Sequence, residues 1–352
     1  MSKTILLALF ALIAGGTQAA QDAEPAKSPA AANDAHEIVE VKKIWDAGGH
    51  NAFTDLIRWR DQWWCSFREA DGHVGPTDGK LRLIRSTDGQ KWESAALIAE
   101  EGIDLRDPKL SITPDNRLMM VAGGSIYADK GKKFVGRQPR VLFSADGVKW
   151  TPPQKVLASG DWLWRVTWHE GVAYGATYSN GNAENPKPEW ALKLYSSRDG
   201  IDWSLVTEMK VPNRANETTL RFGPEGEMLA LVRREEGDKL GWLGVAKPPY
   251  KEWTWKPTNQ RLGGPDFIRI PDGRWIAGTR YHAEGKAQAV IASLATDGTL
   301  TPLVKLPSGG DNSYPRLVWH EGLLWVSYYS SHEGKTSIYL AKVKLKPAAA
   351  AK

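Results

Sequence analysis

The chain has 352 residues, of which 46 are Lys or Arg and 41 are Asp or Glu, so the formal net charge is +5 at pH 7. The basic residues are spread along the chain without the runs that line a nucleic-acid groove, so no nucleic-acid partner is expected. Cys65 is the one cysteine, which excludes a disulfide within the chain, and we expect it in a buried strand.

The N-terminal residues have the pattern of a secretory signal peptide. Lys3 precedes the apolar run ILLALFALIAGG, and small residues follow at Thr17, Ala19 and Ala20. We predict a signal peptide over 1–20 and a secreted or periplasmic protein. No second long apolar segment follows, so membrane insertion is not expected.

The composition divides the rest of the chain into a short linker, one large domain and a tail. Residues 21–36 are rich in Ala, Pro and polar side chains, and 347–352 are similar, so both segments are expected to be disordered. Residues 37–346 remain as one domain, which is long enough to bury most of its apolar surface.

A polar two-residue turn recurs six times between short apolar runs. Successive turns stand 47 to 55 residues apart: Asp61-Gln62, Asp115-Asn116, Glu170-Gly171, Glu225-Gly226, Asp272-Gly273 and Glu321-Gly322. A run, a polar turn and a second run form a β-hairpin signature. The spacing leaves room for two more strands per unit, as in a propeller blade. We predict an all-β fold, a six-bladed β-propeller of four-stranded antiparallel blades over 37–346.

A second repeated element occurs three times, as STDGQKW at 86–92, SADGVKW at 144–150 and SRDGIDW at 197–203. Asp-Gly supplies a tight turn, and the Trp is expected to pack between blades. These segments resemble the Asp-box of sialidases and other BNR-repeat propellers, with one residue missing from the usual Ser-x-Asp-x-Gly-x-Thr-Trp in every copy. The resemblance implies a sialidase-like propeller with these boxes at its periphery.

Aligning the six hairpins brings the starts of the innermost strands together at one mouth of the central channel. The first aligned position contains Thr54, Asp107, Leu163, Glu217, Pro265 and Tyr314. The next contains Asp55, Pro108, Trp164, Thr218, Asp266 and Pro315. Four carboxylates at one mouth indicate a site, while plugging of a water-filled channel is the structural alternative.

Arginines end the second strand of three of these hairpins, at Arg68, Arg233 and Arg280. Such arginines suit a bidentate hold on a carboxylate or sulfate, although a solvent-exposed strand end would also accept them. Trp162 or Trp164 could stack on a sugar ring.

The segment NETTLRFGPEGEMLALVRR is similar to the sialidase pattern of a Glu, a Gly-containing turn and an Arg, here Glu217 and Arg233. The resemblance implies that Tyr314 is the nucleophile, that Glu217 accepts its proton, and that Asp78, eight residues before Ser86, is the acid/base. Arg233 and Arg280 match two arginines of the family's triad.

The first arginine of that triad is missing. The family places it in a Tyr/Phe-Arg-Ile-Pro motif, which reads Phe53-Thr54-Asp55-Leu56 in this chain. The predicted function is therefore an exported exo-glycosidase acting on an acidic or modified glycan, rather than a sialidase in the strict sense. The predicted substrate-binding residues are Arg68, Arg165, Arg233, Arg280, Asp55, Asp107, Asp266, Trp164 and His73.

Two alternatives stay open. His73 lies in the loop EADGHVGPTDG, and a His beside carboxylates can act as an acid or base, as in propeller polysaccharide lyases acting on uronate-containing glycans. A non-catalytic glycan-binding propeller is the alternative from another class. No His/Asp/Glu cluster has ligand spacing, so no metal or cofactor is predicted, and the protein is expected to be a monomer.

Overall fold

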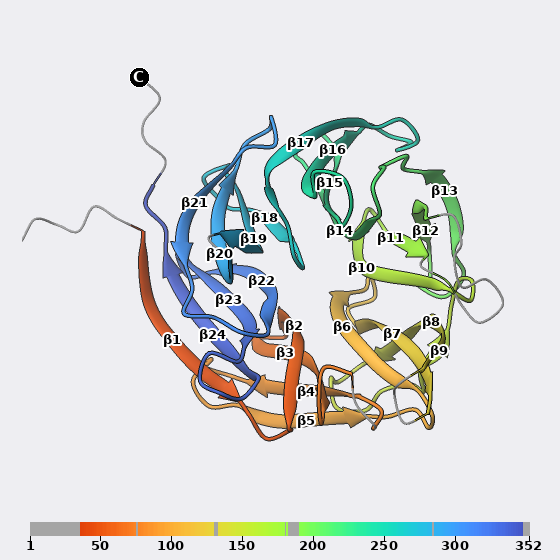
Figure 1. Cartoon of the computed structure of the whole chain (residues 1–352), viewed down its shortest axis with the longest axis vertical. Coiled ribbons are helices and arrows are strands. Elements are labelled where there is room, and N and C mark those ends of the chain that lie inside the picture. Colours follow the sequence, from red (N-terminus) through yellow and green to blue (C-terminus); the bar gives the residue numbers. More distant parts are fainter. Residues whose placement is uncertain are drawn as a thin grey trace, which may run out of the picture. The chain divides into compact units, whose positions relative to one another are not determined.

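The computed structural model describes residues 36–74, 77–129, 133–179, 181, 190–283 and 285–347. In these residues the chain forms 24 strands in six four-stranded antiparallel sheets. The sheets surround a central axis as the blades of a propeller (Figure 1). This confirms the predicted fold class. The predicted signal peptide over 1–20 and nearly all of the linker and tail lie outside the described residues.

Each blade is built from strands that are consecutive in the sequence, except the last. Blades 1 to 3 contain β2 (His50–Trp59), β3 (Gln62–Ala70), β4 (Lys80–Ser86) and β5 (Glu93–Ile98); β6 (Asp104–Ile112), β7 (Leu118–Ala128), β8 (Lys133–Ser144) and β9 (Gln154–Lys155); β10 (Asp161–His169), β11 (Val172–Ser179), β12 (Leu192–Ser197) and β13 (Ser204–Glu208). Blades 4 and 5 contain β14 (Ala215–Phe222), β15 (Met228–Arg234), β16 (Leu240–Ala246) and β17 (Thr254–Arg261); β18 (Asp266–Arg269), β19 (Trp275–Ala283), β20 (Lys286–Leu294) and β21 (Leu300–Lys305).

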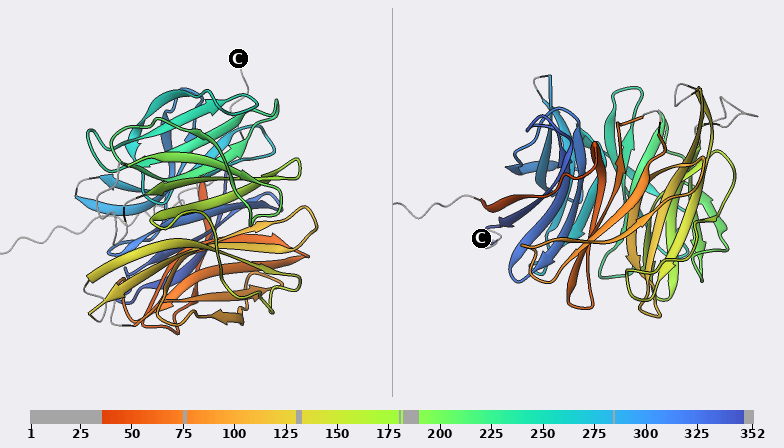
Figure 2. Two further views of the ribbon diagram at one scale, coloured as in Figure 1. Left: turned by 90° about the vertical axis from the view of Figure 1, so that its right-hand side faces the viewer. Right: turned by 90° about the horizontal axis from the view of Figure 1, so that it is seen from below.

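Blade 6 joins the two ends of the described chain. It consists of β22 (Asn312–His320), β23 (Leu323–Ser330), β24 (Ser337–Lys344) and the N-terminal strand β1 (Glu37–Trp45). β1 pairs with β24 along its length and forms the outer edge of the blade (Figure 2, red beside blue). The ring is therefore closed by backbone hydrogen bonds between the first and last strands.

All six predicted turns lie where the two innermost strands of a blade are joined, although in blade 1 the loop is Arg60-Asp61, one residue before the predicted Asp61-Gln62. In blades 1, 3 and 6 the loop has two residues, both with positive φ, such as Glu170 (49°) and Gly171 (77°). This is the hairpin turn whose twist matches that of the flanking strands. In blades 2, 4 and 5, five residues separate the two innermost strands.

The three STDGQKW-like segments form the same turn in blades 1, 2 and 3. In the first copy Asp88 Oδ1 accepts the N–H groups of Gln90 and Lys91, and Ser86 Oγ accepts that of Gly89. A Cβ at Gly89, where φ is +70°, would lie 2.4 Å from the ring of Trp325 in blade 6. The turn therefore requires glycine and brings neighbouring blades into contact.

Apolar side chains from facing sheets fill the spaces between blades. Trp63 of blade 1 stacks on Trp325 of blade 6 at 4.3 Å between ring centroids, and both are buried. Cys65 is fully buried in β3 and carries no disulfide. The core thus consists of inter-blade layers, which leaves the start of each innermost strand free to face the channel.

A β-bulge lies near the start of the innermost strand in blades 1, 2, 3, 4 and 6. Pairing resumes after it at Asp55, Lys109, Val166, Thr218 and Arg316, and at Asp266 in blade 5. In the five bulged blades the first bulge position is occupied by Phe53, Asp107, Trp164, Asn216 and Tyr314, and the second by Thr54, Pro108, Arg165, Glu217 and Pro315. The equivalent residues of blade 5 are Gly264 and Pro265.

This register corrects the alignment from the sequence by one residue in blades 1, 3, 4 and 5. Counting back from the turns misplaced these residues because the hairpins differ in loop and strand length. Arg280, which pairs with Gly263, is equivalent to Arg234 and Arg68, and Arg233 lies one position earlier. A bulge re-aims side chains at a strand end, which explains why the site lies here.

Candidate active site

Tyr314 and Glu217 meet across the channel from blades 6 and 4. The Tyr314 hydroxyl donates a hydrogen bond of 2.5 Å to Glu217 Oε1. Both residues lie on bulges, and Tyr314 has a φ of 53°. A non-glycine residue in this region is strained, and such strain is commonly retained at functional sites. The two residues predicted as nucleophile and base are therefore in direct contact.

The other oxygen of Glu217 is held by two donors. Arg233 Nη1 and the backbone N–H of Gly264 each donate to Oε2 at 2.8 Å. Burial would raise the pKa of Glu217, but Arg233 and the hydrogen bonds from Tyr314 and Gly264 lower it below its usual value. Glu217 is thus an ionised carboxylate with a fixed orientation toward the tyrosine.

Tyr314 is enclosed by rings and a cation. Its ring lies 5.4 Å from that of Phe53 and 5.0 Å from that of Trp164, which meets it edge-on. The Lys109 ammonium lies 4.9 Å from the centroids of the Tyr314 and Trp164 rings. Burial, then the charges of Glu217 and Asp107, raise the pKa of Tyr314 well above its usual value. The hydroxyl is therefore protonated at neutral pH and needs a base to react.

Gly264 makes room for the tyrosine. A Cβ at this position would lie 1.8 Å from Cδ1 of Tyr314, and its φ of +57° also favours glycine. The ring therefore packs directly against the backbone whose N–H binds Glu217.

Asp107 is a second carboxyl at the same mouth. It is 8% exposed, has a φ of 51°, and its Oδ1 has no hydrogen-bond partner within the described part of the chain. Burial raises its pKa, the cations of Lys109 and Arg106 oppose this, and the negative charge of Glu217 adds to it. A buried carboxyl with an unused oxygen and a raised pKa suits proton donation.

Asp55, Asp266 and Arg165, which were predicted to bind substrate, belong to a buried ion network deeper in the channel. Asp55 Oδ1 pairs with Arg165 at 2.8 Å and with Arg316 at 3.3 Å. Asp266 accepts two bonds of 3.0 Å from Arg316 and a further bond from Arg221. These carboxylates are already paired with arginines of the protein, which supports the alternative that they plug the channel.

Arg68 and Asp78 belong to the loop side of blade 1. Arg68 is fully buried, and it binds Asp104 Oδ1 at 2.8 Å and the carbonyl of Gly72 at 2.7 Å. It therefore anchors the loop rather than facing the channel as an open clamp. Asp78 is exposed, and burial of part of its surface and the nearby Asp104 raise its pKa.

The position of the missing arginine is occupied by a buried threonine. Thr54 Oγ1 donates to the Tyr314 carbonyl at 2.8 Å and so holds the start of the Tyr314 strand. Arg280 donates to the Asn312 carbonyl at 3.1 Å and has no carboxylate partner within the residues described. Trp164, a predicted stacking residue, is 1% exposed, and it packs on Tyr314 without presenting a free face.

His73 lies at the rim beside a histidine and an aspartate that were not singled out in the sequence. Its Nδ1 is 2.9 Å from Asp311 Oδ2, and His50 Nε2 is 2.8 Å from the same oxygen. His50 and Asp311 each stand three residues before the bulge positions Phe53 and Tyr314 of adjacent blades. A repeat alignment in the correct register could have found this pair.

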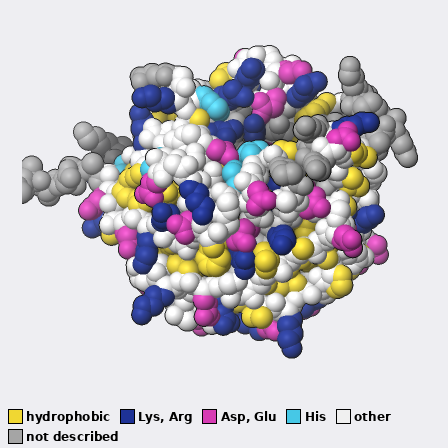
Figure 3. Space-filling view, turned by 60° about the horizontal axis from the view of Figure 1, so that its bottom comes forward, with side chains coloured by type: hydrophobic (Ala, Val, Ile, Leu, Met, Phe, Trp, Pro, Cys, Tyr) yellow, Lys and Arg dark blue, Asp and Glu magenta, His cyan; other side chains and the backbone are white. Residues whose placement is uncertain are grey.

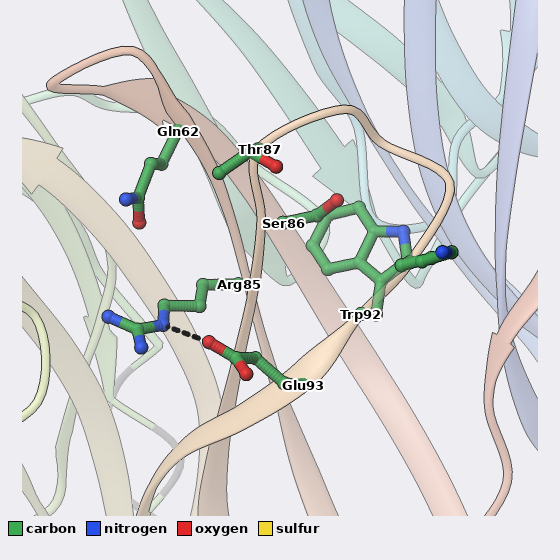
Figure 4. Close-up of a pocket in the computed structure, with 7 residues that line it drawn as sticks. Gln62, Arg85, Ser86, Thr87, Trp92 and Glu93 are labelled. Carbon is green, nitrogen blue, oxygen red and sulfur yellow. Dashed lines mark hydrogen bonds and ion pairs between the residues drawn. The ribbon is translucent and has the colours of Figure 1, made fainter.

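The cavity in Figure 4 is distinct from the mouth of the channel. Acidic and basic side chains are interspersed over the face in Figure 3. A cavity of about 400 Å³ lies against the STDGQKW turn of blade 1 (Figure 4). Arg85, Trp92 and Glu93 are among the residues that line it. Its labelled side chains include an Arg85–Glu93 ion pair of 2.7 Å and none of the residues at the mouth. Among the described residues, no helix could cross a membrane.

Comparison with known proteins found similar proteins among the solved structures alone. No protein-family model and no curated protein matches the chain. A protein of unknown function from Dyadobacter fermentans superposes with a TM-score of 0.76 at 20% identity, over 89% of this chain and 100% of that one. A mutant of the α-L-arabinofuranosidase Arb93A of Fusarium graminearum, in complex with an iminosugar inhibitor, gives a TM-score of 0.66 at 13% identity, over 88% of this chain and 98% of that one.

A sialidase of Trypanosoma rangeli, in complex with the inhibitor DANA, gives a TM-score of 0.62 at 12% identity, over 83% of this chain and 55% of that one. At these identities the likeness establishes the fold, a sialidase-like six-bladed propeller.

Proposed function

We propose that the protein is an exo-glycosidase of sialidase-like design, with Tyr314 as nucleophile and Glu217 as the base that activates it. The observation that carries the proposal is the 2.5 Å hydrogen bond from the tyrosine hydroxyl to the carboxylate. The solved structures named above include glycosidases on the same fold, which supports a carbohydrate substrate.

The site supplies what a tyrosine nucleophile needs. A buried neutral phenol is a poor nucleophile, and its proton must leave as the new bond forms. Glu217 is held ionised by Arg233 and already accepts the hydrogen bond along which that proton would move. The Tyr314 oxygen attacks the anomeric carbon, the proton passes to Glu217, and the glycosidic bond breaks. Tyrosine nucleophiles are the known exception to the paired-carboxylate scheme of glycosidases.

The leaving oxygen takes a proton from a carboxyl group, and two groups qualify. The sequence resemblance assigned this role to Asp78, which lies on the exposed loop. Asp107 has the buried setting, the raised pKa and the unpartnered oxygen that a proton donor requires. We propose Asp107 as the proton donor and retain Asp78 as the alternative. The resulting carboxylate then activates the water that releases the sugar from Tyr314.

Arg280 has no carboxylate partner among the described residues, which supports an acidic or modified glycan. The Lys109 ammonium also lies near the tyrosine ring, whereas Arg106 is paired with Asp104. Since Arg233 is already paired with Glu217 and Glu235, and Thr54 replaces the first triad arginine, a sialic acid carboxylate has no complete clamp. We also propose that the protein is exported, on the basis of the predicted signal peptide.

The test is a screen of the purified protein against aryl glycosides and acidic oligosaccharides, with Tyr314→Phe in parallel. Release of a terminal reducing sugar, lost in the variant, supports the proposal. A product with the ultraviolet absorbance of an unsaturated uronate indicates the lyase instead. Saturable binding without turnover by the wild-type protein indicates a glycan-binding propeller.

A further inference from the structure

Three side chains converge at the rim of the mouth, beside the proposed catalytic pair but outside it. They are His50, the first residue of β2, His73 in the segment after β3, and Asp311 just before β22. One ligand atom from each lies within 4.8 Å of the other two. His50 is 7% exposed, whereas the His73 side chain is 52% exposed.

We propose that His50, His73 and Asp311 form a binding site for a divalent metal ion of the Zn²⁺ class. Two imidazole nitrogens with one carboxylate oxygen are a donor set that suits Zn²⁺ and related transition metals, whereas Ca²⁺ and Mg²⁺ prefer oxygen ligands alone. Three protein ligands leave a fourth tetrahedral position for water, and the exposed side of His73 provides access to it.

The distances from the two nitrogens to the carboxylate oxygen need little adjustment. A tetrahedral ion with bonds of about 2.0–2.2 Å separates its ligand atoms by roughly 3.3 Å. The two nitrogens lie 2.8 and 2.9 Å from Asp311 Oδ2, so each distance would lengthen by a few tenths of an ångström. His73 is largely exposed and can make that shift without disturbing the core.

The position of the site indicates what the ion would do. His50 and His73 belong to blade 1 and Asp311 to blade 6, so the ion would join these two neighbouring blades. The His73 ring meets Phe53 edge-on at 5.1 Å, and Phe53 packs on Tyr314. An ion held here would fix the blade 1 loop next to the mouth.

Calorimetric titration of the chelator-treated protein with ZnCl₂ tests the proposal without any assay of activity. We expect one ion per chain, and a higher midpoint of thermal unfolding with zinc than without it. His73→Gln and Asp311→Asn should each weaken binding by more than about 100-fold, since even indirect ligand partners contribute 10–100-fold. His320→Gln, in the β22–β23 hairpin, is the matched control and should bind as the wild type does.

His73→Gln changes an exposed side chain, so its unfolding midpoint without zinc should equal that of the wild type. Co²⁺ should give the visible absorption of a tetrahedral site in the wild type, and this should vanish in the variant. Absence of saturable one-to-one binding, or equal binding by His73→Gln, would overturn the proposal and leave a hydrogen-bonded His–Asp–His cluster.

Discussion

Tyr314 in blade 6 and Glu217 in blade 4 are 97 residues apart in sequence and share a 2.5 Å hydrogen bond across the channel. The contact depends on two bulges and on a glycine in blade 5, so three blades cooperate to make it. Backbone strain of the kind seen at Tyr314 is commonly retained at functional sites, which is why we propose a chemical role for this contact.

Gly264→Ala should reduce turnover strongly while leaving the fold intact. The new methyl group would lie 1.8 Å from the Tyr314 ring and would displace the hydroxyl from Glu217. Gly226→Ala is the matched control, because its φ of +78° carries a similar backbone cost of about 1 kcal/mol with no atom within 4 Å. The kcat values and unfolding midpoints of both variants decide the matter. Equal loss of kcat in the two would show that the tyrosine position is not critical.

Asp107→Asn should lower kcat/KM about 100-fold or more on substrates with poor leaving groups, and much less on activated aryl glycosides. The reason is that a proton donor matters least when the leaving group needs no proton. Because the pKa of Asp107 is raised, the protonated form persists to higher pH than for an ordinary Asp, and activity should fall as pH rises through that pKa. Asp78→Asn is the comparison, and the opposite ranking of the two variants would assign the role to Asp78.

Asp266→Asn should destabilise the protein by about 3–5 kcal/mol, since it leaves buried arginines without their partner. Burial would raise the pKa of Asp266, but Arg316, Arg221 and Arg165 lower it below its usual value. The contribution is therefore present above the pKa of the unfolded state and is lost as pH falls toward the folded one. Denaturant unfolding at pH 7 and pH 3 measures it. Asp272→Asn, at an exposed turn, should cost less than about 1 kcal/mol, and equal costs would contradict the network's role.

An aryl sialoside should be a poor substrate compared with the best acidic glycoside found in the screen. Thr54 is buried and bonded to the Tyr314 carbonyl, so no arginine completes a clamp at that position. The comparison of kcat/KM values on the two substrates tests this. Efficient release of sialic acid, abolished by Arg233→Ala, would show that another arginine completes the clamp.

The fold could be predicted from the sequence because its signals are local. Each hairpin turn, such as Glu170-Gly171, is set by neighbouring residues, and a polar turn of two or five residues recurs at the same place in every blade. The contact between Glu217 and Tyr314 followed from the repeat together with the family resemblance. The alignment was one residue out at Glu217 and correct at Tyr314, so the error did not separate the two partners.

The partners of the channel charges could not be predicted, since they depend on register and on the packing of distant blades. Asp55 pairs with Arg165, 110 residues away, and His50 lies beside Asp311, 261 residues away. A bulge shifts the register by one position, so counting back from a turn places a residue one position away from its true place. The alignment was one residue out in blades 1 and 5, so Asp55 and Asp266 were predicted at the mouth but lie in the buried network.

The most direct test of the account is turnover by Tyr314→Phe and Glu217→Gln on the best substrate, with thermal unfolding measured on the same samples. Phenylalanine keeps the ring contacts with Phe53 and Trp164 and removes only the hydroxyl. We predict that each variant loses at least about a thousandfold in kcat with little change in unfolding midpoint. Wild-type turnover by both variants, at unchanged stability, would contradict the tyrosine-nucleophile mechanism.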